Sequence, residues 1–111
     1  MTVLLFVRNL MFADRILTAA ASAGFEAGPF DPALPPAAVP DLIIVDLGEP
    51  GWEEAVAWAK AQAPRPRILG FGPHVRADLF EAARRNGVDR AVANSKLSED
   101  PAALMNEVAR G

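Results

Sequence analysis

Three segments of the chain are apolar runs, each about as long as one β-strand. They cover residues 3–7, 42–45 and 68–71. Continuous apolar runs are typical of strands buried on both faces, as in a parallel sheet covered by helices. Two weaker candidates, residues 91–93 and 25–27, bring the predicted number of strands to five, and we expect the last of these near an edge of the sheet.

Between these runs, apolar residues recur every three or four positions, which is the spacing of an amphipathic helix. The pattern covers residues 12–21, 52–63 and 79–85. A fourth helix is predicted from Asp100, which can act as N-cap, with Pro101 at the first helical position. Strands that alternate with helices predict right-handed βαβ units and therefore an α/β fold with a parallel sheet.

The second crossover interrupts this alternation. Five of the ten prolines lie in it, at Pro29, Pro32, Pro35, Pro36 and Pro40. Proline lacks a backbone donor and clashes with the preceding helical turn, so a regular helix cannot contain this segment. We expect a proline-rich loop, with room for one helical turn, in place of most of the second helix.

Composition limits the class of protein. With 111 residues the chain can build one core, and we expect residues 1–111 to form a single domain. Cysteine is absent, which excludes disulfides and thiolate metal sites and favours a cytoplasmic protein. The net charge of −3 argues against binding nucleic acid through a global field, and no apolar run approaches the roughly 20 residues of a membrane span. Neither nucleic acid nor a membrane is therefore an expected partner.

Polar residues follow four of the predicted strands. In an open parallel sheet, ligands bind outside the carboxyl ends of the strands. The residues expected at that edge include Arg8, Asn9, Asp46, Glu49, His74, Asn94, Ser95 and Lys96. Folds of this kind generally end their strands in polar loops, so the gathering alone identifies no chemistry.

Residues 40–51, with the sequence PDLIIVDLGEPG, resemble the third-strand motif of bacterial response-regulator receiver domains, the CheY-like family. Residues 67–72 are similar to the family's fourth strand, and residues 86–92 to the lead-in and start of its fifth. The resemblance implies a flavodoxin-like, doubly wound sheet of five strands in the order 2-1-3-4-5. It also implies that Asp46 occupies the position at which receivers accept a phosphoryl group.

Other positions depart from the family. Receivers end the first strand with paired acidic residues that hold Mg²⁺, and this chain has Arg8 and Asn9 there. They end the fourth strand with Ser or Thr, matched here by Phe71 or a flanking glycine, and the fifth with Lys-Pro, matched by Asn94 and the residue after it. Lys96 lies two residues late. Because Mg²⁺ needs oxygen ligands and phosphoryl transfer depends on charge neutralisation, we expect a pseudo-receiver with no Mg²⁺, no other cofactor and no enzymatic activity.

We expect Asp46 to be held by a cation rather than phosphorylated. Arg8 and Lys96 are the candidate partners, and an Arg8–Asp46 pair would place a fixed positive charge where an active receiver holds Mg²⁺. His74 is the only histidine and has no second His or Cys near it, so we expect it in a surface loop rather than as a metal ligand.

The resemblance also indicates a surface for protein partners. In receivers, the face formed by the fourth helix, the fifth strand and the fifth helix is the usual dimer or output surface. By that resemblance a homodimer could form through the same face, with Leu97, Leu104 and Val108 as interface candidates. Trp52 and Trp58 are six residues apart, and we expect one in the core and the other partly exposed.

Three functions are compatible with these residues. The first is a stand-alone signalling or interaction module that is independent of phosphorylation and acts by protein–protein contact. The second is a working receiver, phosphorylated on Asp46 by a histidine kinase in a two-component phosphorelay. The third is a small-ligand binder or enzyme that uses the crevice at the strand ends, with Arg8, Asn9, Asp46, His74 and Asn94. The altered residues around Asp46 favour the first.

Overall fold

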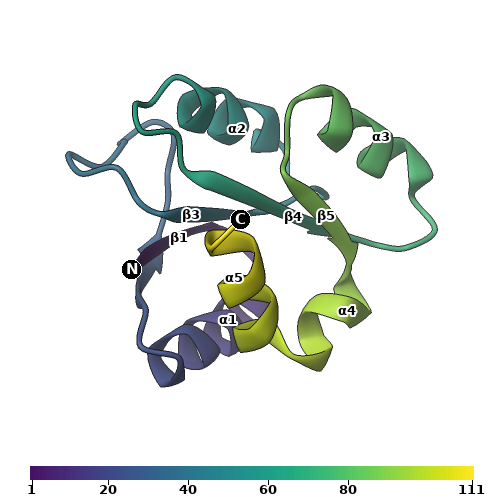
Figure 1. The fold of residues 1–111 in the computed structure, drawn as a ribbon. Helices are drawn as coiled ribbons and strands as arrows, with labels where there is room; N and C mark the ends of the chain where they lie inside the picture. The colour runs from purple at the N-terminus through teal and green to yellow at the C-terminus, as the bar shows by residue number, and fades with distance from the viewer.

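One layer of β-strands lies between two layers of helices, and the computed structural model describes this arrangement for residues 1–111 (Figure 1). All strand pairs are parallel, and the sheet has the order β2-β1-β3-β4-β5. The strands are β1 Thr2–Phe6, β2 Glu26–Pro29, β3 Leu42–Asp46, β4 Arg67–Gly72 and β5 Arg90–Ala93. The predicted sheet and strand order are confirmed, with the weak candidate β2 at one edge.

Helices α1 and α5 cover one face of the sheet, and α2 and α3 cover the other (Figure 1). The helices are α1 Leu10–Ser22, α2 Trp52–Lys60, α3 Ala77–Arg85, α4 Asn94–Glu99 and α5 Pro101–Ala109. The four predicted helices are present, and Asp100 caps α5 as expected by accepting a hydrogen bond from Ala103 N at 3.1 Å. Helix α4 was not predicted, because six residues around one buried side chain, Leu97, show no periodicity. None of these helices is long and apolar enough to cross a membrane.

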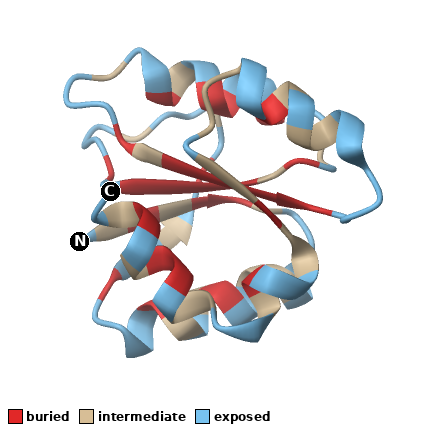
Figure 2. Cartoon of the chain, turned by 45° about the vertical axis from the view of Figure 1, so that its right-hand side comes forward, coloured by how far each residue is buried: buried red, intermediate tan, exposed pale blue.

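Buried apolar side chains form two clusters, one on each face of the sheet, because successive strand residues point to opposite faces. On β3, Leu42 and Ile44 enter the cluster covered by α1 and α5, whereas Ile43 and Val45 enter the cluster covered by α2 and α3. Figure 2 shows the buried residues along the strands and on the inner sides of the helices. This two-sided burial explains why the strand segments are continuous apolar runs.

The three interface candidates belong to this core. Leu97, Leu104 and Val108 are all buried in the cluster covered by α1 and α5, so their selection as interface residues is wrong. On α5, positions 104, 105 and 108 form the stripe that packs on the sheet, which leaves them little surface to offer a partner. The tryptophans follow the prediction, because Trp52 is buried and Trp58 is half-buried.

Residues 30–41 form the predicted proline-rich loop, which lies beside α2 (Figure 1). At its start, Phe30 is buried against Trp58, with ring centroids 5.1 Å apart. At its end, Asp41 is fixed to Thr2 by two hydrogen bonds: Asp41 N donates to Thr2 O at 2.9 Å, and the Asp41 carboxylate accepts from Thr2 N at 2.8 Å. The loop therefore covers part of the sheet without forming a helix.

Candidate functional site at the carboxyl edge

Asp46 is the last residue of β3 and lies at the carboxyl edge of the sheet. Its strand is central, with β1 on one side and β4 on the other, and Asp46 is in register with Phe71 of β4. The β1–β3 pair is the place where the order of the strands reverses, and open α/β sheets form their ligand crevices at such points. The fold thus puts Asp46 where its sequence motif predicts.

The turn after Asp46 follows from its sequence. Gly51 has a φ of +94°, a left-handed conformation that glycine adopts without strain, and it forms the N-cap position of α2. Pro50 precedes it, and the Asp46 carbonyl accepts a hydrogen bond from Glu49 N at 3.1 Å. These contacts end β3 sharply and lead the chain into α2.

The Asp46 carboxylate is half-buried, and its Oδ1 accepts one hydrogen bond, from Gly48 N at 2.9 Å. Burial raises the pKa of the Asp46 carboxyl above its ordinary value; the Gly48 hydrogen bond lowers this pKa, and the nearby charge of Glu49 raises it. Asp46 takes part in none of the five ion pairs of the protein. The carboxylate therefore lacks the positive charge that would stabilise its ionised form.

The predicted ion pair between Asp46 and Arg8 or Lys96 is wrong. Arg8 lies instead over the ring of Phe6, with its guanidinium carbon 5.3 Å from the ring centroid, a cation–π contact. Lys96 belongs to α4 and lines a hollow between α4 and α5 together with Glu107. The pair was predicted because all three residues follow strand ends at the same edge of the sheet. A long side chain such as that of Arg8 can reach several partners, however, and arginine stacks well on aromatic rings.

Asn9 has a structural role at the end of β1. Its Oδ1 accepts a hydrogen bond from Phe12 N at 3.1 Å and so caps α1. This bond engages the oxygen that a hard divalent ion would need, and the neighbouring Arg8 is a cation. Nowhere in the protein are three or more His, Cys, Asp or Glu side chains grouped to hold a metal ion. The residues at the end of β1 therefore do not fit the Mg²⁺ that the receiver resemblance implies.

Phe71, the neighbour of Asp46 across the sheet, is buried and apolar. Its ring stacks on Phe12 of α1, with centroids 5.1 Å apart and an interplanar angle of 22°. Phe71 was predicted to line the site; it borders Asp46 as its cross-strand neighbour, but its ring is buried in the core cluster covered by α1 and α5. At this point the site has an aromatic stack and no hydroxyl group.

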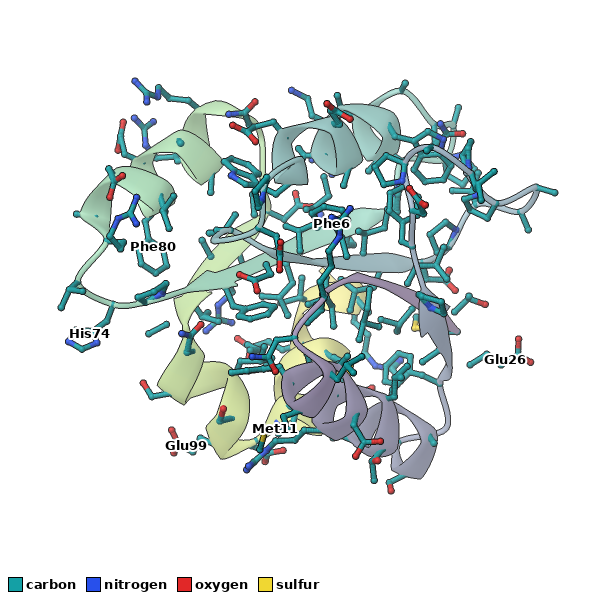
Figure 3. The ribbon with its side chains drawn as sticks, turned by 180° about the vertical axis from the view of Figure 1, so that it is seen from behind. Phe6, Met11, Glu26, His74, Phe80 and Glu99 are labelled. Carbon is teal, nitrogen blue, oxygen red and sulfur yellow. The ribbon has the colours of Figure 1, made fainter.

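His74 and Asn94 follow the ends of β4 and β5. His74 is exposed in the turn before α3, where Figure 3 shows it at the rim of the molecule, as predicted for a surface loop. Asn94 is the first residue of α4, because β5 passes into that helix with no intervening loop. Neither residue takes part in an ion pair or a side-chain hydrogen bond with Asp46.

Sequence reasoning placed Glu49 at this edge but did not foresee its effect on Asp46, and it missed Phe12. Glu49 adds a second negative charge near Asp46, and Phe12 joins the first turn of α1 to Phe71. The position of Glu49 three residues after Asp46, within a glycine-containing turn, is the local signal for that effect. No local signal predicts the stacking of Phe12 on Phe71, because the two residues are far apart in the chain.

Comparison with solved structures identifies the fold as that of response-regulator receiver domains. A receiver domain protein from Clostridium thermocellum matches with a TM-score of 0.79 at 14% identity, covering 98% of this chain and 94% of that one. A second match is a response regulator from Burkholderia pseudomallei, solved with a phosphorylated aspartic acid, a calcium ion and citrate. Its TM-score is 0.77 at 20% identity, and the match covers 98% of this chain and 68% of that one. An orphan response regulator of H. pylori matches with a TM-score of 0.73 at 18% identity, covering 99% of this chain and 94% of that one. No protein-family model and no curated protein matches the sequence.

The protein therefore has the CheY-like receiver fold, and the predicted flavodoxin-like topology is confirmed. At 14–20% identity the likeness establishes the fold alone. Function has to be argued from the side chains around Asp46.

Proposed function

We propose that this protein is a receiver-like signalling module that acts by contact with a protein partner and does not depend on phosphorylation of Asp46. The observation that carries the proposal is the environment of Asp46. Its carboxylate keeps the strand-end position, with one backbone hydrogen bond and no ion pair.

Phosphoryl transfer needs charge neutralisation around the transferred group. An aspartyl phosphate at position 46 would add negative charge beside Glu49, which already disfavours the ionised carboxylate. Arg8 is stacked on Phe6, and the Asn9 amide oxygen caps α1. These contacts support an Asp46 that stays unmodified.

The surface around Asp46 favours a protein partner over a small ligand. The protein has three hollows, lined by residues of α4 and α5, by residues near the C-terminus, and by the first turn of α1 with Ser98. Asp46 lines none of them. Binding a small molecule normally requires a concave, mostly apolar site with a few convergent polar groups, and none of the three hollows includes Asp46.

Incubation with Mg²⁺ and acetyl phosphate, followed by intact-mass measurement, tests the proposal. We expect no phosphorylated species, because the groups that would neutralise the phosphoryl charge are engaged elsewhere. Asp46→Asn is the matched control, since it keeps the side-chain size and removes the acceptor oxygen. A gain of one phosphoryl group that disappears in Asp46→Asn would contradict the proposal and identify a working receiver.

A further inference from the structure

Charge is distributed unevenly along this chain. Residues 16–59 contain seven of the 14 acidic residues and none of the 11 Lys and Arg residues, a formal charge of −7. The rest of the chain holds the other seven acidic residues and all 11 cations, a formal charge of +4. The acidic segment includes the second half of α1, β2, the loop of residues 30–41, β3 and most of α2.

None of the seven acidic residues of this segment takes part in an ion pair. Five of them are exposed and take part in no ion pair, namely Glu26, Asp31, Asp41, Glu53 and Glu54. Outside the segment, four of the seven acidic residues are paired with arginines. The uncompensated charge therefore belongs to residues 16–59.

A large apolar side chain is exposed within this acidic segment. Leu34 is 79% exposed in the loop of residues 30–41. The turn that carries it is fixed by Asp31, whose carboxylate accepts a hydrogen bond from Ala33 N at 2.9 Å and whose carbonyl accepts one from Leu34 N at 3.0 Å. Pro32 and Pro35 on either side restrict the backbone further.

Both ends of the loop are anchored. Phe30 packs on Trp58 of α2, and Asp41 is hydrogen-bonded to Thr2 of β1. A segment that is already ordered loses little conformational entropy when it binds, so an apolar side chain on it contributes more of its burial energy to affinity. The loop thus presents Leu34 on a rigid support.

We propose that the loop of residues 30–41 docks into a partner protein, with Leu34 entering an apolar pocket whose rim carries Lys or Arg. The inference rests on the proposed function, because it names the surface and the partner class of that protein contact. An acidic surface repels the phosphates of nucleic acids and anionic lipids, so charge complementarity selects a basic protein surface.

The first turn of α1 also exposes a leucine, but the charges near this leucine do not indicate the charge of a partner. Leu10 is 82% exposed. The charged residues near it are Arg8, Asp14 and Arg15, which have both signs. Leu10 therefore serves as the matched control for Leu34, because the two leucines are similarly exposed and lie on different elements.

Titration of the ¹⁵N-labelled protein with an amphipathic peptide of Lys and Leu, followed by amide NMR shifts, tests the proposal. We expect the largest shifts at the non-proline amides of residues 31–39. Leu34→Ala should weaken binding at least tenfold, because the buried leucine is the apolar anchor, while Leu10→Ala should leave the affinity unchanged. Peptides in which Ser replaces Leu, or Glu replaces Lys, should bind at least tenfold more weakly.

Equal binding to Leu34→Ala, shifts that map to other elements, or equal binding of the Glu peptide would overturn the proposal. Concentration-dependent shifts of residues 31–39 without peptide would also overturn it, by identifying a second copy of the chain as the occupant. These failures would leave the proposed function intact as long as acetyl phosphate does not label Asp46. Phosphorylation of Asp46 by acetyl phosphate would contradict the proposed function, whatever the result of the peptide titration.

Discussion

Two aspartates at opposite edges of the sheet have contrasting environments. Asp89 precedes β5 at the amino edge, and its carboxylate is only 17% exposed. It accepts hydrogen bonds from Ile68 N at 2.7 Å and from Arg65 at 3.0 Å, and Arg67 lies 4.0 Å away. Asp46 at the carboxyl edge has one backbone hydrogen bond and no cation.

The contrast separates a carboxylate that stabilises the fold from one that does not. Asp89 connects the start of β4 to the lead-in of β5, and Arg65 adds a bond from Nη2 to Gly87 O at 2.7 Å. Charge-assisted bonds of this kind are the strong ones in proteins. At Asp46, burial disfavours the ionised form and nothing of opposite charge offsets it. An arginine–aspartate pair was expected in this protein at Asp46, and the structure has such pairs at Asp89 and Asp78 instead.

The largest effect is expected at the amino edge. Asp89→Ala would leave Ile68 N and the Arg65 guanidinium without their acceptor, so we expect the free energy of unfolding to fall by about 2–3 kcal/mol. Urea denaturation measures this change. Asp46→Ala is the matched variant at the other edge, and we expect it to change stability by less than about 0.5 kcal/mol. If the two variants lost the same free energy of unfolding, the two aspartates would not differ in their contribution to stability.

A smaller effect is expected at Asn9. Asn9→Ala removes the cap of α1, so we expect a loss of about 1 kcal/mol in thermal unfolding. Asn9→Asp should retain the wild-type stability, because aspartate caps helices as well as asparagine does. If Asn9→Ala instead unfolded at the wild-type temperature, the cap would not be the main role of this position.

The fold was predictable because its signals are local. The runs at residues 3–7 and 42–45 are buried on both faces of the sheet, and such burial requires continuous apolar sequence. The site was only partly predictable. The position of Asp46 follows from its strand, but the direction of Arg8 depends on which of two partners, Phe6 or Asp46, lies within its reach.

The remaining errors have the same origin. Leu104 and Val108 form an apolar stripe that suits either a core or an interface, and only the packed structure shows that α5 turns this stripe to the sheet. The stack of Phe12 on Phe71 joins elements that are distant in sequence, so no spacing could reveal it. Contacts between distant segments therefore limit what a single sequence predicts about this site.

The ionisation of Asp46 itself tests the central claim, that this carboxylate keeps its position without a cation. An NMR titration of the side-chain carboxyl carbon, assigned with Asp46→Asn, measures its pKa. We expect a pKa above the ordinary value of about 3.9, because burial disfavours the charged form. The folded protein would then bind the proton more tightly than the unfolded chain, so the contribution of Asp46 to stability should fall as pH rises between those two pKa values. A pKa below about 3.9 would show that a cation or hydrogen bonds stabilise the ionised carboxylate more than burial disfavours it, and would contradict the account.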